Sequence, residues 1–211
     1  MLNRFPNDRI NNFCDAVFAI AMTLLILEIK IPTTEALNEF GTWGVLARLI
    51  PSFIGFMISF LVTALYWRLH LAIAQFVKSY DNRLLWYNIW LLMSIVLLPF
   101  STAFYAKGYN NDHGTFIFYC VNLIMIGLLN FFMFNYIVRK EGYSENLTPS
   151  IVARLRSRII IAPIFWALSI PLEFVEPWVA RFLFVFIFVV EGIAQRRFDK
   201  KEKLAKQQLS L

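Results

Sequence analysis

The chain contains few charged, histidine, cysteine and glycine residues for its length of 211 residues. Charged side chains make up only 16% of the sequence, whereas apolar side chains make up 59% and aromatic ones 17%. A soluble domain typically carries about 25% charged residues, so this composition excludes an ordinary soluble domain. Long uncharged runs recur along the chain, and each is close to the roughly 20 residues that a helix needs to cross a bilayer. The composition therefore predicts an all-α membrane protein.

The few histidines and cysteines also argue against an enzyme. His70 and His113 are the only histidines, and Cys14 and Cys120 are the only cysteines. The predicted topology puts the members of each pair on opposite sides of the membrane, so they cannot form a metal site together. The eight glycines are scattered and form no phosphate-binding loop. We therefore expect no enzymatic activity, no cofactor and no resident metal.

Six uncharged runs predict six transmembrane helices, of which the last two have the shortest uncharged cores. Pro163 and Pro171 interrupt the fifth run, and Glu173 and Glu176 leave a tight turn before the sixth. We assign residues 1–196 to a six-helix transmembrane domain and residues 197–211 to a basic cytoplasmic tail. The predicted helices are Asn12–Ile29, Val45–Trp67, Leu84–Tyr105, Thr115–Val138, Ile159–Leu172 and Trp178–Gln195.

The 20 lysines and arginines are distributed unevenly among the predicted connections. Most lie in the amino-terminal segment, the second and fourth connections and the tail, and the alternate connections and their flanks hold only Lys30, Arg48, Lys107 and Arg181. The positive-inside rule then predicts that both termini are cytoplasmic, as six spans require. The basic residues flank apolar spans and form no patch with interleaved aromatics, so we expect membrane lipid and no nucleic acid as a partner.

The first span carries ionisable residues at its entrance and a regular stripe further along. Arg9 and Asp15 lie where the helix enters the membrane, and this costly position points to function. At about 100° per residue, four later side chains share one helix face. They are Ile20, Thr23, Leu24 and Leu27. In an oligomer each position would form a ring, and an apolar ring can stop flow by dewetting. The alternative is an ordinary helix-packing face, and the spacing alone does not decide between the two.

The first span also resembles a known family signature. The run Arg9-x-x-x-Phe13-x-Asp15-Ala-Val-Phe-Ala-Ile20-Ala-Met-Thr23-Leu24-Leu-Ile-Leu27 is similar to the first helix of the transmembrane protein 175 family. This family comprises the potassium channels of lysosomes and endosomes and their prokaryotic relatives. The end of the second predicted helix, Tyr66-Trp67-x-x-His70, and the six-helix count agree with one repeat of the family.

The resemblance implies a moderately selective potassium channel in the plasma membrane of a prokaryote. It implies a homotetramer whose first helices line a central pore for potassium ions without a carbonyl filter. It further implies that Ile20 forms the narrowest layer and that Thr23 supplies a pore hydroxyl. Leu24 and Leu27 fall on the apolar layers beyond them.

The family motif usually has Ser between Phe13 and Asp15, where this chain has Cys14. A thiol is a weaker hydrogen-bonding group than a hydroxyl, so any bond at this position is weakened. Arg9 and Asp15 lie about 9 Å apart along a helix and need partners other than each other.

We expect the motif to form a polar and aromatic cluster with the end of the second helix, which carries Trp67 and His70. This cluster would hold the first helix in place. The alternatives are an Arg9 side chain that extends to lipid headgroups and an Asp15 side chain that stabilises a helix amino terminus.

Other side chains within the spans are expected to support the fold. Phe18, in the first span, is expected to face lipid. Four polar side chains of the third and fourth spans are expected to form hydrogen bonds between helices. They are Asn88, Ser94, Asn122 and Asn130.

A secondary ion transporter or proton-coupled carrier is the main alternative function. Carriers usually use an ionisable group or a broken helix near the bilayer centre, and the first four predicted spans contain neither. The residues alone also leave open a structural or assembly role in the membrane.

Overall fold

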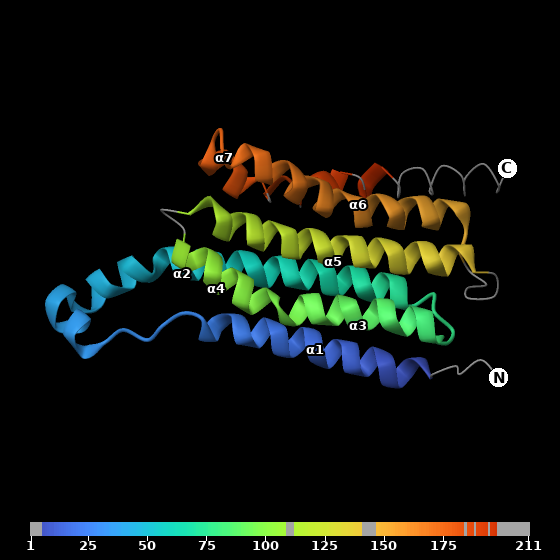
Figure 1. Cartoon of the computed structure of the whole chain (residues 1–211), viewed down its shortest axis with the longest axis horizontal. Coiled ribbons are helices and arrows are strands. Elements are labelled where there is room, and N and C mark those ends of the chain that lie inside the picture. Colours follow the sequence, from blue (N-terminus) through green and yellow to red (C-terminus); the bar gives the residue numbers. More distant parts are fainter. Residues whose placement is uncertain are drawn as a thin grey trace.

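The chain folds into a bundle of helices, which we describe from a computed structural model (Figure 1). The structure describes residues 6–108, 112–140, 147–183, 185–187, 189–193 and 195–197. Its helices are α1 (Asn7–Leu27), α2 (Thr34–Ala74), α3 (Asn82–Val96), α4 (Leu98–Gly108), α5 (His113–Arg139), α6 (Pro149–Leu172) and α7 (Pro177–Phe182). The predicted tail, residue 197 apart, lies outside the described residues.

Polar side chains set the starts of four helices. Thr33, Asp81, Asp112 and Thr148 each precede a helix and accept a hydrogen bond from a backbone N–H in its first turn. The first N–H groups of a helix have no partner within the helix, and such caps satisfy them. The polar connections of the sequence therefore determine where α2, α3, α5 and α6 begin.

Four helical segments of the described chain are long and apolar enough to cross a membrane. They are Asn7–Leu27, Thr34–Ala74, Asn82–Lys107, which joins α3 to α4, and His113–Arg139. Each contains one of the first four predicted helices or, for α1, most of it. Successive long helices run in opposite directions through the bundle (Figure 1). The chain is thus a multi-pass membrane protein.

The fifth predicted helix, Ile159–Leu172, starts too late, because α6 already begins at Pro149. The prediction placed Arg156 and Arg158 in a connection, since charge is costly in lipid. In the structure these arginines have partners. Arg156 Nη2 donates to Asn135 Oδ1 at 3.0 Å, and Arg158 Nε donates to Glu191 Oε1 at 2.8 Å. The paired charges allow the helix to continue.

The sixth predicted helix, Trp178–Gln195, corresponds to α7 and to the helical residues 185–187, 189–193 and 195–197. The turn before α7 is held by Glu173, which is fully buried. Glu173 Oε1 accepts a hydrogen bond from Arg181 Nη2 at 2.8 Å and lies 3.3 Å from His113 Nδ1. One carboxylate thus connects α7 and the turn to the start of α5.

The helix α5 forms the centre of the bundle and packs against α3, α4 and most extensively α6. In its most apolar stretch 50% of the residues are buried, compared with 22% for α1 and 17% for α2. Figure 1 accordingly shows α1 at one edge of the bundle. A helix at the edge leaves a large part of its surface uncovered by the rest of the chain.

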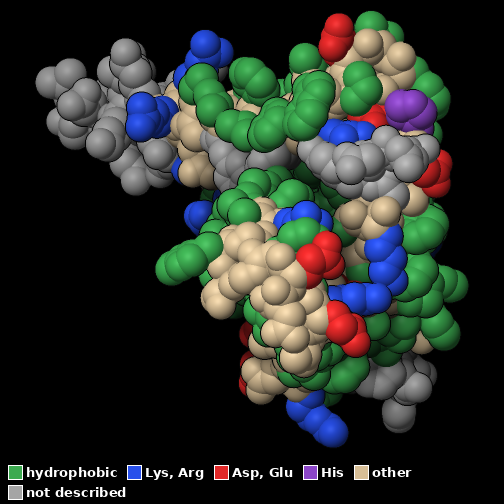
Figure 2. Space-filling model, turned by 90° about the vertical axis from the view of Figure 1, so that its left-hand side faces the viewer, with side chains coloured by type: hydrophobic (Ala, Val, Ile, Leu, Met, Phe, Trp, Pro, Cys, Tyr) green, Lys and Arg blue, Asp and Glu red, His purple; other side chains and the backbone are tan. Residues whose placement is uncertain are grey.

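The first part of α2 projects beyond the other helices at the end of the bundle opposite the amino terminus (Figure 1). Gly41 breaks the helix there with a φ of 66°, a conformation that glycine adopts without steric cost. Trp43 follows the break and is 84% exposed. Viewed from this end, charged side chains of both signs lie over the projecting region, and hydrophobic side chains are exposed around it (Figure 2).

The expected hydrogen bonds between helices are present for two of the four polar side chains. Asn88 Nδ2 donates to Cys14 Sγ in α1, and Asn122 Nδ2 donates to Ser101 Oγ in α4. The expectation is wrong for the other two, because Ser94 and Asn130 donate to backbone carbonyls one turn earlier in their own helices. Short polar side chains in a helix often bond in this way.

We predict that Gly127→Ala separates α5 from α6. A Cβ atom at Gly127 would lie 2.1 Å from Cγ of Pro163, whose ring is fixed to the α6 backbone. Overpacking of this kind should lower the free energy of unfolding by about 1–3 kcal/mol. Denaturant titration of the purified protein in detergent micelles measures the change.

Gly55→Ala is the matched control, because a Cβ atom at Gly55 meets nothing within 4 Å. Replacing a glycine inside a helix by alanine should there raise stability by up to about 1 kcal/mol. Equal changes at the two glycines would contradict the close approach of α5 and α6.

Candidate functional site

The helix α1 has one packed face and one open face. Cys14, Phe18, Ala21 and Leu25 recur at helical spacing and are at most 2% exposed. They face the rest of the bundle, where α1 contacts α2, α3 and α4. At 100° per residue these side chains cover one side of the helix, so the opposite side has no partner within the described chain.

The predicted pore positions all lie on the open face of α1. Ile20 is 58% exposed, Leu24 38% and Leu27 72%, and Thr23 is exposed with them. The hydroxyl of Thr23 donates to the carbonyl oxygen of Ile20 at 2.8 Å. Because its proton is used within the helix, the Thr23 oxygen can act outward only as an acceptor. The open face thus combines an apolar stripe with one accepting oxygen.

The expectation that Phe18 faces lipid is wrong. Phe18 is fully buried, and its ring centroid lies 5.7 Å from that of His70 in α2. Phe18 follows Cys14 by four residues and precedes Ala21 by three, which places it on the packed face. The sequence pattern did not reveal this, because both faces of α1 are apolar.

Part of the predicted cluster at the entrance of α1 comes together in the structure. Trp67 Nε1 donates to Asp15 Oδ1 at 2.8 Å, which connects α2 to α1. His70 packs against α1 through Phe18 and is 1% exposed, and neither of its ring nitrogens has a hydrogen-bond partner in the described part of the chain. The structure therefore brings Asp15, Trp67 and His70 to one side of α1.

The other motif residues lie elsewhere. Phe13 is 61% exposed, and Arg9 is exposed and makes no hydrogen bond or ion pair with the residues that the structure describes. Cys14 is buried on the packed face and accepts a hydrogen bond from Asn88 Nδ2 at 3.0 Å. The thiol thus lies between α1 and α3 and acts as a hydrogen-bond acceptor that connects the two helices.

Sequence reasoning missed further links between the start of α1 and its neighbours. Tyr80, in the connection before α3, donates to Asn11 Oδ1 at 3.2 Å, and burial raises the pKa of its phenol and keeps it a donor. The side chain of Asn7 donates to the carbonyl of Val77. A signal was present, because Asn7, Asn11 and Cys14 recur at i, i+4 and i+7 and continue the packed face towards the amino terminus.

Groups for metal binding do not gather in this region. Among the residues that the structure describes, no three His, Cys, Asp or Glu side chains lie close enough to hold a metal ion. The site at α1 consists of a packed face that is attached to the bundle and an open face that is mainly apolar.

Comparison with known proteins shows which family this chain resembles. A family model described as the endosomal/lysosomal potassium channel TMEM175 matches residues 9–99, which include most of α1 and all of α2 and α3. A protein of Chryseobacterium sp. (strain P1-3), named a potassium channel, is 29% identical over 92% of this chain and 97% of its own length. These matches support a prokaryotic member of the TMEM175 family. The resemblance of its first-helix motif to this family is confirmed.

Two further proteins show similarity to the chain. A protein of Streptomyces collinus, also named a potassium channel, is 34% identical over 57% of this chain and 58% of its own length. The crystal structure of a lysosomal potassium-selective channel TMEM175 homolog from Chamaesiphon minutus matches with a TM-score of 0.76 and 25% identity, covering 91% of this chain and 97% of the homolog. The family and these relatives are channels rather than enzymes, which supports a channel.

We predict that Trp67→Phe weakens the attachment of α1 to α2. The change removes the donor to Asp15 and keeps most of the ring, so it should lower the free energy of unfolding by about 1–3 kcal/mol. A double-mutant cycle with Asp15→Ala in detergent micelles measures the coupling between the two side chains.

The control is Trp86→Phe, because Trp86 lies early in α3 and is 52% exposed. We expect a change within about 0.5 kcal/mol, as for most exposed positions. Strictly additive effects of Trp67→Phe and Asp15→Ala would show that the hydrogen bond does not anchor α1.

Proposed function

We propose that four copies of this chain form a potassium-selective cation channel whose α1 helices surround a central pore. The relatives from Chryseobacterium and Streptomyces are named potassium channels, and the matched Chamaesiphon structure is titled a potassium-selective channel homolog. One chain supplies one copy of α1, and a single helix cannot enclose water. The proposed function therefore requires several copies around one axis.

The observation that carries this proposal is the open face of α1. All four stripe positions are exposed on it, while the opposite face is attached to the bundle. Four chains arranged with this face inward would form rings of Ile20, Thr23, Leu24 and Leu27. The resemblance to the family assigns the same positions to the pore, although it rests on the sequence and not on burial.

The proposed mechanism follows from the chemistry of these rings. A narrow ring of Ile20 side chains removes water from a passing ion and supplies no oxygen ligand to replace it, so it disfavours strongly hydrated ions. Potassium holds its water less tightly than sodium, and such a constriction therefore favours potassium. The Thr23 ring would present accepting oxygens one turn away, which would partly replace the water that the ion has lost. Dewetting at Ile20 would close the pathway.

We further propose six membrane spans within residues 1–196, with both termini in the cytoplasm of a prokaryotic cell and the domain in its plasma membrane. The uneven distribution of lysine and arginine supports this orientation. The start of α1 and the helical residues 195–197 lie toward the same end of the bundle, as an even number of spans requires (Figure 1).

We predict that Ile20→Asn weakens discrimination between potassium and sodium. An amide ring would hydrate the constriction, so the reversal potential should move from near the potassium potential towards zero. Recordings from purified protein in planar bilayers, with potassium on one side and sodium on the other, measure this shift.

Ile26→Asn provides the matched control for this experiment. Ile26 lies on the same helix and is 41% exposed, but it is rotated about 120° from Ile20 around the helix axis. Its reversal potential should equal that of the unmodified protein. Equal shifts at both positions would show that Ile20 does not line the pore. Slow saturable ion uptake without unitary currents would favour a carrier.

We predict that the Thr23 hydroxyl contributes to conduction. Thr23→Val keeps the shape and removes the oxygen, so the unitary potassium conductance should fall several-fold. Thr23→Ser keeps the oxygen and should retain most of the conductance. Single-channel recordings of both variants provide the comparison, and similar conductances for valine and serine would exclude a role of the hydroxyl in the pore.

A further inference from the structure

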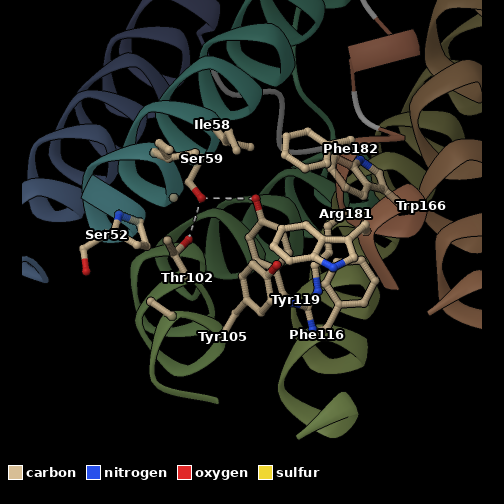
Figure 3. A pocket seen from close by; sticks show the side chains of 15 residues that line it. Ser52, Ile58, Ser59, Thr102, Tyr105, Phe116, Tyr119, Trp166, Arg181 and Phe182 are labelled. Carbon is tan, nitrogen blue, oxygen red and sulfur yellow. Dashed lines mark hydrogen bonds between the residues drawn. The ribbon is translucent and has the colours of Figure 1, made fainter. Parts of the chain in front are cut away.

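A cavity of about 330 Å³ lies on the side of the bundle away from α1. Residues of α2, α4, α5, α6 and α7 line it, and α1 contributes none (Figure 3). Its volume falls within the ~300–1,000 Å³ typical of small-molecule sites. The pore proposed above therefore does not account for this cavity.

Aromatic rings from several helices form one wall of the cavity. The ring of Tyr105 stacks on Tyr119 with centroids 5.6 Å apart and lies 5.3 Å from Phe116. Tyr119 in turn meets Trp166 edge-on at 6.0 Å. Four packed rings from three helices form a rigid apolar surface, which suits a hydrocarbon body.

A small group of hydroxyls on the wall includes one proton that has no acceptor. Thr102 donates to Ser59 at 3.0 Å, and Ser59 and Tyr119 share a second hydrogen bond of 3.1 Å (Figure 3). Three hydroxyls carry three protons, and these two bonds use two of them. No acceptor for the third lies among the described residues.

Trp166 also lines the cavity and is 2% exposed. Its indole N–H lies beside the hydroxyl of Tyr66, which itself donates to the carbonyl of Leu123, so we assign this N–H to Tyr66 and not to a ligand. A buried donor without an acceptor is costly, and most such groups in proteins are satisfied. The unused hydroxyl proton is a donor, so a complementary ligand must carry an accepting oxygen.

The charge at the cavity is balanced. Among the described residues of its lining Arg181 is the only charged one, and its guanidinium is paired with the buried carboxylate of Glu173. A charged ligand would have to compete with this pair or remain uncompensated. The site therefore favours an uncharged ligand.

The rim of the cavity consists of side chains suited to contact with lipid. Ile54, Trp178 and Phe182 all line the cavity and are 49%, 62% and 52% exposed. We propose that the cavity binds an uncharged acyl ester from the bilayer, with its hydrocarbon chain against the aromatic wall and its carbonyl oxygen at the hydroxyls of Ser59, Thr102 and Tyr119. The proposed site does not depend on the proposed pore, because α1 contributes no residue to it, and its test requires no ion current.

The test uses the methyl ester of a twelve-carbon fatty acid with a photoreactive diazirine on its chain. The purified oligomer in detergent is irradiated with this ester, and the adducts are mapped by peptide mass spectrometry. We expect labelling of peptides that line the cavity, competition by unlabelled ester, and at least a tenfold loss in Gly55→Leu. Gly55 lines the cavity and has open space at its Cβ position, so leucine fills the site without a clash at the backbone.

Gly192→Leu is the matched control. Gly192 also has open space at its Cβ position and does not line this cavity, so labelling should be unchanged. Tyr119→Phe removes one hydroxyl and should weaken binding about three- to tenfold, the effect of one hydrogen bond. Labelling spread over all exposed helices, or unchanged in Gly55→Leu, would overturn the proposal, because it would show ordinary lipid contact only.

The source of the ligand is determined by a second arm of the experiment. Lipid extracted from the purified protein without added probe is analysed by mass spectrometry for the unmodified chain and for Gly55→Leu. A glyceride or phospholipid lost selectively in the variant identifies the acyl chain of a bilayer lipid as the occupant. Cavity labelling without such a lipid supports a free ester of the same chemistry.

Discussion

The structure depends on the attachment of α1 by one face only. Four side chains of small or apolar character pack this face into the bundle, and hydrogen bonds from Trp67, Asn88 and Tyr80 hold its first half. Within a bilayer, apolar contacts between helices gain little over contacts with lipid, so such polar links and close packing carry much of the specificity. Because only the packed face of α1 is attached to the bundle, its open face is available for the proposed ion pathway.

The remainder of the bundle supplies a firm support for this helix. The close approach of α5 and α6 at Gly127 and the balanced charges of Glu173 and Arg181 join its distant parts. Every such charge needs a partner, because the surrounding medium cannot solvate it. The same requirement explains how α6 includes arginines that a loop was expected to carry.

The helices α2 and α4 contribute both to the support of α1 and to the aromatic cavity. Ser59 and Thr102, which belong to these two helices, are buried and bonded to each other. A molecule bound in the cavity would therefore contact helices that pack directly against the packed face of α1. The proposed pore and the cavity would thus share α2 and α4 as supporting helices.

Much of the fold and part of the site could be predicted from the sequence. The uncharged runs predicted the first four long helices, because crossing a bilayer requires length and apolarity and both are local properties. The motif from Arg9 to Asp15 and the stripe from Ile20 to Leu27 identified α1 as the important helix and indicated its family. The sequence did not place Phe18 correctly, since an apolar side chain suits contact with lipid and contact with protein equally well.

The tertiary structure alone decided which residues meet. It gave α6 its early start by pairing Arg156 and Arg158, separated Arg9 and Phe13 from the contact between Asp15 and Trp67, and formed the cavity from five helices. Partners such as Glu191 and Arg158 lie far apart in the chain, and no local pattern encodes their distance. The sequence by itself determined the membrane-spanning character and the family, because these depend on local composition and on a contiguous motif. The faces of the helices and the partners of the charges depended on packing.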